Sequence, residues 1–139
     1  MDSFDYRERA AAELISWISA TGAERSANAG SHLIREGDQA EALLFLLDGQ
    51  LDAITSDADQ RDVTLGSLAA GAVIGEMSWL EQRPAVADIV GSSDCRLIEL
   101  PFSSIQQRER SNPHLAAPLY RLLAQKLALQ IQQQNIRLA

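Results

Sequence analysis

Two short segments decide the fold of this 139-residue chain: Gly75-Glu76-Met77-Ser78-Trp79-Leu80 and, beginning nine residues after Glu76, Ala85-Val86-Ala87-Asp88-Ile89. The first segment follows an apolar run and opens with a glycine, and its next residues can form a short helix. The second segment resumes a strand that continues through Ile89. Together they predict a strand, a short helix and another strand in close succession; residues 75–89 are called the cassette below.

The sequence around the cassette, from about residue 32 to residue 100, consists of short apolar runs broken by glycine. Asp48-Gly49 is a strong turn signal between two of these runs. The polar stretch from Thr55 to Asp62 is typical of a hairpin tip. Many short strands with regularly spaced turns favour a small β-barrel or sandwich.

Both ends of the chain have helical periodicity instead. At the N-terminal end the apolar residues spaced for one helix face are Phe4, Ala11, Leu14, Ile15 and Ile18. Gly22 is expected to end this helix as a left-handed cap. Asn112-Pro113 marks the start of the C-terminal helical region, with a kink or a restart at Pro118.

These signals predict one domain over residues 1–139 that is mainly β with flanking helices. An N-terminal helix is expected at about 4–20, and a jelly-roll-like β-roll (a double-stranded β-helix) at about 28–101. C-terminal helices are expected at about 102–138, and the last of them is long.

The last helix is apolar on two sides. One set of apolar residues follows a three-four spacing, and a second set repeats every seven residues. One side can pack on the β-roll, and the other favours contact with the same helix of a second copy, so we expect a homodimer. Coverage of both sides within one chain is the alternative. The first set is Ala117, Tyr120, Ala124, Leu127, Ile131 and Leu138, and the second is Leu115, Leu122, Leu129 and Ile136.

Composition narrows the functional classes. The net charge of −7 and the absence of a basic run argue against direct nucleic-acid binding. No apolar run is long enough for membrane insertion. The single cysteine, Cys95, is expected to be a small core residue in a reducing compartment, so we expect a cytoplasmic protein.

An enzyme is not expected. The two histidines, His32 and His114, lie on unrelated elements without metal-ligand spacing, so a cupin-like metal site is not indicated. No nucleophile–base pair can be recognised. The sequence therefore predicts no catalytic residue, no metal and no cofactor.

Four segments in order resemble the cyclic-nucleotide-binding domain family: residues 30–38, residues 44–51, residues 71–76 and the cassette itself. The resemblance extends over about residues 12–130. It implies an eight-stranded β-roll with one helix before it and two after it. It also implies that the last helix makes dimer contacts and covers the ligand pocket.

The resemblance also implies roles for the cassette. In the family a glycine lets the backbone approach the ligand, a glutamate accepts the ribose 2′-hydroxyl, and an arginine with a neighbouring Ser or Thr holds the phosphate. Gly75 and Glu76 match the first two roles, and Met77 and Ser78 continue into the short helix. The candidate ligand-binding residues are Gly75, Glu76, Met77, Ser78, Arg83, Ala85, Val86 and Ala87.

The phosphate-binding half of the cassette departs from the family. With Ala87 aligned, the arginine position falls on Ala85 and the hydroxyl position on Val86, and Asp88 adds a negative charge nearby. Because a bidentate charge-assisted contact is among the strongest hydrogen bonds in proteins, its loss should cost about two to three decades of affinity. The interpretation is a non-catalytic regulatory or interaction module that binds cAMP or cGMP weakly or not at all and acts through a protein partner.

Three alternatives stay open. Arg83 lies two residues before Ala85, so a slip of two along the strand would keep it on the same face, where it could bind the phosphate. The chain would then be a working cyclic-nucleotide sensor, as part of a larger regulator or a transporter. Glu76 could instead be a structural carboxylate that accepts backbone hydrogen bonds. The pocket could also take another metabolite, and the missing positive charge favours a neutral one.

Overall fold

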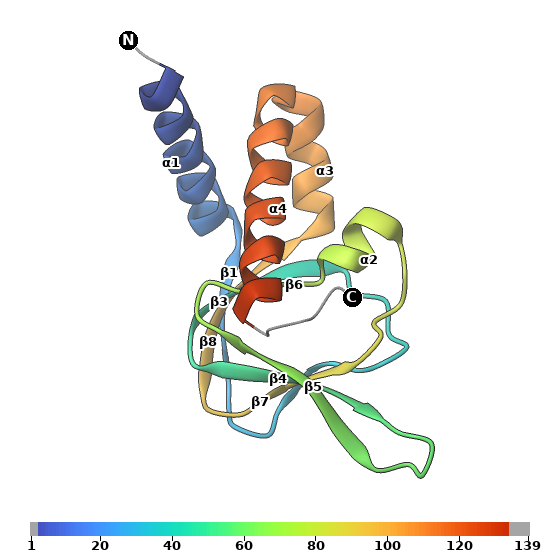
Figure 1. Ribbon diagram of the computed structural model, residues 1–139. Helices are drawn as coiled ribbons and strands as arrows, with labels where there is room; N and C mark the ends of the chain where they lie inside the picture. The colour runs from blue at the N-terminus through green and yellow to red at the C-terminus, as the bar shows by residue number, and fades with distance from the viewer. Residues whose placement is uncertain (1–2, 134–139) are drawn as a thin grey trace.

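The computed structural model describes residues 3–133, and its class is the expected one, mainly antiparallel β with flanking helices (Figure 1). Helix α1 (Ser3–Thr21) comes first, and α3 (Phe102–Ser111), a 3-10 turn η1 (Pro113–Leu115) and α4 (Ala116–Gln133) come last. Helix α2 (Glu76–Glu81) lies between β6 and β7. The strands are β1 (Ala23–Ala27), β2 (His32–Ile34), β3 (Ala42–Asp48), β4 (Gln50–Ser56), β5 (Asp62–Ala69), β6 (Val73–Ile74), β7 (Asp88–Gly91) and β8 (Cys95–Pro101).

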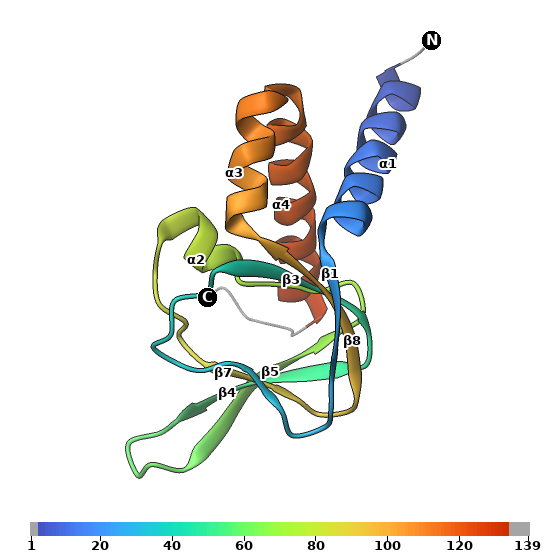
Figure 2. The ribbon, with the colours of Figure 1, turned by 180° about the vertical axis from the view of Figure 1, so that it is seen from behind.

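The strands form two four-stranded sheets, with the orders β1-β8-β3-β6 and β2-β7-β4-β5. One apolar cluster, which includes Leu44 and Leu97, fills the interior of the roll between the sheets. A second cluster, which includes Leu43 and Leu100, joins the opposite face of the first sheet to α1, α3 and α4 (Figures 1 and 2). Because β3 is buried on both faces, its sequence is a nearly continuous apolar run rather than an alternating one.

The predicted turns are confirmed. Gly49 follows β3 with a φ of +99°, and a β-carbon there would lie 2.4 Å from the carbonyl oxygen of Asp94, so the position requires glycine. The tip between β4 and β5 is organised by Asp57, whose carboxylate Oδ1 accepts the backbone N–H groups of Asp59 and Arg61, both at 2.9 Å. Cys95 is buried, as expected of a core residue.

The end of α1 differs from the prediction. Gly22 does not have a left-handed φ. A side chain is excluded there for another reason: a β-carbon would lie 2.4 Å from Cγ2 of Ile98. The chain then enters β1 at once, pairing Ala23 with Glu99 on β8, so the roll starts earlier than the expected residue 28.

The face of α4 that packs on the domain belongs to neither predicted set. Leu119 and Leu123, one helical turn apart, are each 2% exposed because α4 contacts both α1 and β6 there. Ala117, Tyr120 and Ala124 of the first predicted set are exposed instead. Leu122 is half-buried, and the side chains of Leu115, Leu127, Leu129, Ile131, Ile136 and Leu138 lie outside the described residues. None of the helices in residues 3–133 is long and apolar enough to cross a membrane.

Candidate ligand-binding site

Gly75 forms the junction between β6 and α2. Its φ is +93°, and a β-carbon at this position would lie 2.6 Å from the carbonyl oxygen of Ala42, at the start of β3. A left-handed backbone and a close approach to another strand both select glycine. The fold therefore needs Gly75 at this junction whether or not a ligand approaches the backbone there.

Ser78, in the middle of α2, is buried and its hydroxyl group is already engaged. The hydroxyl donates to the carbonyl oxygen of Arg83 at 2.8 Å and accepts the backbone N–H of Ala40 at 3.4 Å. These two bonds fasten α2 to the loop before β3 and to the loop that follows α2. The side chain of Ser78 therefore supports the cassette and is not free to bind a ligand.

Glu76 is half-buried at the first position of α2. Burial raises the pKa of its carboxyl group, and the hydrogen bond from the backbone N–H of Glu76 itself offsets this only in part. A carboxylate retained for the fold would have its charge stabilised by the fold. The charge on Glu76 is instead destabilised by burial, which argues against a structural role for the ionised carboxylate.

We expect Glu76→Gln to stabilise the domain at neutral pH. The folded-state pKa of the carboxyl group is raised, so the stability conferred by its neutral form is lost as pH rises from the unfolded value of 4.5 through the folded value. Glutamine keeps the shape and the acceptor without the charge. Urea unfolding over a pH series should show an advantage for the variant that grows with pH and vanishes in acid. Greater stability of the wild-type protein at neutral pH would restore the structural interpretation of Glu76.

The segment Ala85-Val86-Ala87 is held against the turn that follows β2. The backbone N–H of Ala85 donates to the carbonyl oxygen of Asp38 and its carbonyl oxygen accepts the N–H of Gly37, both at 2.8 Å. Ala87 is buried, whereas the side chain of Val86 is 63% exposed. Met77, on α2, is also exposed.

Asp88 does not act as the sequence suggested. Its neighbour Ile89 packs against the cluster inside the roll, so alternation along β7 turns Asp88 to the outer face. There the carboxylate accepts the backbone N–H of Glu36 at 2.6 Å and lies 3.5 Å from Nε2 of His32. The carboxylate therefore ties β7 to β2.

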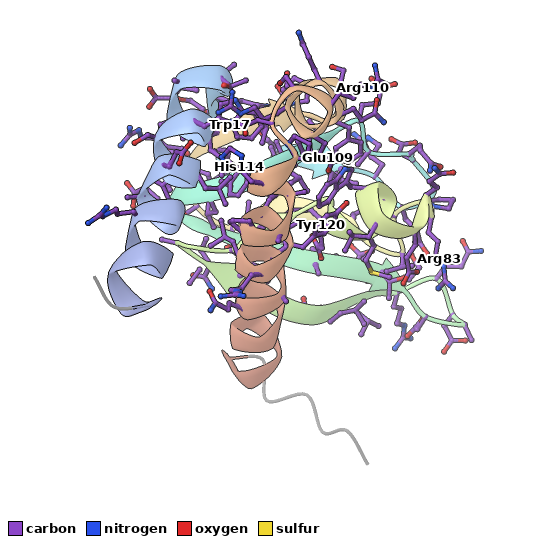
Figure 3. The ribbon with its side chains drawn as sticks, turned by 90° about the horizontal axis from the view of Figure 1, so that it is seen from above. Trp17, Arg83, Glu109, Arg110, His114 and Tyr120 are labelled. Atoms are coloured by element: carbon purple, nitrogen blue, oxygen red, sulfur yellow. The ribbon has the colours of Figure 1, made fainter. Side chains whose placement is uncertain are left out.

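Arg83 lies at the rim of the molecule, beyond α2 (Figure 3). Its guanidinium Nε is 2.9 Å from Oε2 of Glu81, and the two side chains are 66% and 51% exposed. This is the arrangement of a loop cation paired with its neighbour. The phosphate role considered for Arg83 would require the ion pair to break and the side chain to turn inward.

The structure also contains a cavity that the sequence did not reveal. Its volume is about 230 Å³, and none of the candidate cassette residues lines it. Its walls come from β1, β2, β8, the loop before β3 and β3 itself. Among the described residues, no group of three metal-ligating side chains gathers there or elsewhere.

The cassette contacts the last helix through an aromatic stack. The rings of Trp79 on α2 and Tyr120 on α4 are 5.1 Å apart between centroids and inclined by 9°. The hydroxyl of Tyr120 donates to Oε1 of Glu109 on α3 at 3.4 Å. The stack therefore places α2 in direct contact with α4.

Comparison with known proteins agrees with this architecture. The family model of the cyclic nucleotide-binding domain matches residues 24–112. Glutaminase 1 of Bradyrhizobium diazoefficiens is 32% identical over 104 residues, which are 75% of this chain and 16% of the glutaminase. The cAMP-activated global transcriptional regulator CRP of Pasteurella multocida is 30% identical over 98 residues, 70% of this chain and 47% of the regulator.

A solved structure gives the same result. The crystal structure of a cyclic nucleotide-binding domain from Methylobacillus flagellatus has a TM-score of 0.79 and 25% identity, covering 88% of this chain and 68% of that chain. The chain spans less than half the length of the curated relatives described above.

Proposed function

Because the chain belongs to the cyclic nucleotide-binding domain family, we propose that it is a non-catalytic regulatory module whose cassette binds cAMP or cGMP weakly or not at all. The lack of a guanidinium group at position 85 of the cassette carries the proposal. Ala85 stands at the position that the family resemblance gives to arginine, and Arg83 is paired with Glu81 at the rim. Without a guanidinium at position 85, the phosphate keeps only backbone N–H donors. We expect this to lower the affinity for the nucleotide by about two to three orders of magnitude.

The retained half of the cassette supports the same proposal. Gly75 closes the junction with β3, and the hydroxyl of Ser78 fastens two loops. A chain that had stopped binding nucleotides would still need both residues in order to fold. Glu76 keeps an acceptor for a hydroxyl group, which is consistent with weak binding of a nucleoside.

The output of the module is proposed to run through α4. The stack of Trp79 on Tyr120 joins this helix to the cassette, and Ala117, Tyr120 and Ala124 leave one face of it exposed. We assign this face to a homodimer contact or to a protein partner. Sedimentation as a monomer at high micromolar concentration would exclude the homodimer.

The relatives support a module that serves different larger proteins. Regions similar to this chain make up 16% of a glutaminase and 47% of a cAMP-activated transcriptional regulator. Neither whole-protein activity is assigned to the chain. The net charge of −7 supports an output through protein rather than through direct contact with nucleic acid.

Calorimetric titration with cAMP, and then with cGMP, tests the proposal. We expect affinities no tighter than roughly millimolar for both nucleotides. Arg83→Gln should leave any residual binding unchanged, as should the control Arg61→Gln at the β4–β5 tip. Micromolar binding that Arg83→Gln abolishes and Arg61→Gln preserves would establish the alternative, a working sensor that uses Arg83 for the phosphate.

A further inference from the structure

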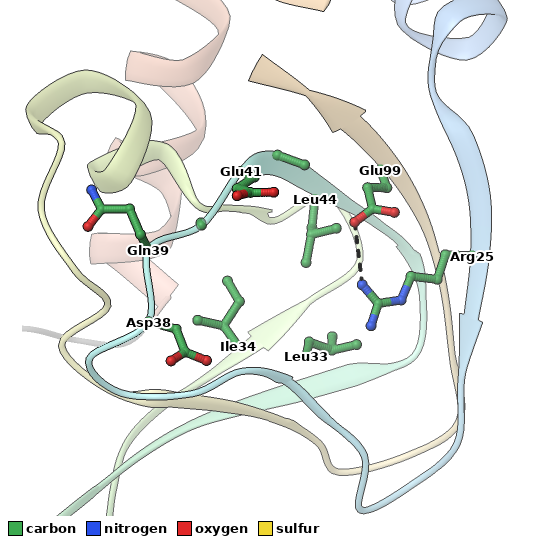
Figure 4. A pocket seen from close by; sticks show the side chains of 10 residues that line it. Arg25, Leu33, Ile34, Asp38, Gln39, Glu41, Leu44 and Glu99 are labelled. Carbon is green, nitrogen blue, oxygen red and sulfur yellow. Dashed lines mark ion pairs between the residues drawn. The ribbon is translucent and has the colours of Figure 1, made fainter. Parts of the chain in front are cut away.

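We propose that the domain has a second ligand site, separate from the cassette, which binds a small aliphatic zwitterion by its ammonium and carboxylate ends. The site is the cavity of about 230 Å³. Figure 4 shows it between the loop before β3 on one side and strands β1 and β8 on the other. The residues that carry the argument are Arg25, Leu33, Ile34, Asp38, Leu44 and Glu99.

The cationic wall is formed by Arg25 on β1. This residue shares the inner face of its strand with the buried Ala27, and Glu99 shares that of β8 with the buried Leu97. Arg25 Nη1 lies 3.6 Å from Glu99 Oε1, too far for a hydrogen bond, and the side chains are 38% and 41% exposed. Arg25 is therefore ion-paired with Glu99 but makes no hydrogen bond within the described residues, so its N–H donors remain available to a carboxylate in the cavity.

The anionic wall is formed by Asp38, which Figure 4 shows across the cavity from Arg25. The backbone of Asp38 is fixed, because its N–H donates to the carbonyl oxygen of Arg35 at 3.0 Å and its carbonyl oxygen accepts the N–H of Ala85 at 2.8 Å. Its carboxylate has no partner among the described side chains. A positioned and unpaired carboxylate is complementary to an ammonium group.

The surface between the two charged walls is apolar. Leu33 and Ile34 are half-buried and Leu44 is 3% exposed, all three packing in the cluster inside the roll. Sites for drug-sized ligands usually have volumes of about 300–1,000 Å³, so this cavity suits a smaller molecule. A short aliphatic chain with opposite charges at its ends matches the floor and both walls. The inference does not depend on what the cassette binds, since no candidate cassette residue lines the cavity.

The test is a titration of the ¹⁵N-labelled chain followed by two-dimensional NMR, with γ-aminobutyrate, δ-aminovalerate and ε-aminocaproate as probes of increasing length. Valerate and pentylamine are the controls, because each keeps an aliphatic body and only one of the charges. At least one zwitterion should shift the amide signals of residues 33–44 and bind about tenfold more tightly than either control. No shift up to high millimolar concentration, or equal affinity for all five compounds, would overturn the proposal.

Two substitutions assign the ends of the ligand. Arg25→Gln should weaken zwitterion binding about tenfold and leave pentylamine unaffected, whereas Asp38→Asn should weaken it similarly and leave valerate unaffected. Arg96→Gln is the matched control for the first, because Arg96 pairs with Glu24 across the same two strands but on the opposite face. Asp59→Asn, at the β4–β5 tip, is the control for the second. An equal loss of affinity in the control variants would contradict the assigned site.

Discussion

The double substitution Ala85→Arg and Val86→Ser should raise the affinity of the domain for cAMP by about 100-fold. Ala85 is half-buried close to the buried Ala87, and we expect an arginine at 85 to be directed inward, toward the start of α2. A phosphate there would meet the guanidinium and backbone N–H groups of that helix end. Calorimetric titration of both proteins with cAMP measures the gain.

The same two residues in reverse order, Ala85→Ser with Val86→Arg, provide the matched control. The composition and the charge are identical, but the side chain at 86 is 63% exposed, so the guanidinium would face solvent. This variant should gain no more than a fewfold through long-range attraction. Asp88 should not oppose the first variant, because its carboxylate is bound to the N–H of Glu36 on the outer face. An equal gain in the two variants, or no gain in either, would show that the missing arginine does not explain weak binding.

The architecture could be predicted because its signals are local in sequence. Asp48-Gly49 requires only two residues to specify a turn, and the apolar run of β3 identifies a strand buried on both faces. Strand β1, with the sequence Ala-Glu-Arg-Ser-Ala, gave no such signal, because only Ala27 of its five residues is buried. It is a strand because β8 is available beside it for pairing, which is a property of the fold and not of the segment.

The candidate site was predictable only in part, for the same physical reason. The sequence located the cassette and the missing arginine at Ala85. It did not indicate that Ser78 and Asp88 are engaged by residues about 40 and 50 positions earlier, near Ala40 and Glu36. The cavity was invisible in the sequence, since it exists only where β1 and β8 come to face the loop before β3.

Gly75→Ala should lower the free energy of unfolding by about 3 kcal/mol, the sum of a strained left-handed backbone and a clash with a neighbouring strand. A β-carbon at 75 would lie 2.6 Å from the carbonyl oxygen of Ala42, and a backbone atom of strand β3 cannot easily withdraw. Urea unfolding of the variant and the wild-type protein measures the difference.

Gly37→Ala separates the two contributions to this loss. Gly37 has a similar φ of +88°, but no atom lies within 4 Å of the position of its β-carbon, so this variant should lose only about 1–2 kcal/mol. The additional loss of unfolding free energy in Gly75→Ala, compared with Gly37→Ala, then measures the contact between the start of α2 and β3 alone. If the two variants lost the same unfolding free energy, the contact with β3 would not require Gly75. The presence of Gly75 in the cassette would then favour a ligand that approaches the backbone. A clear excess means that the first half of the motif persists for structural reasons, which is the condition under which its second half could change without loss of the fold.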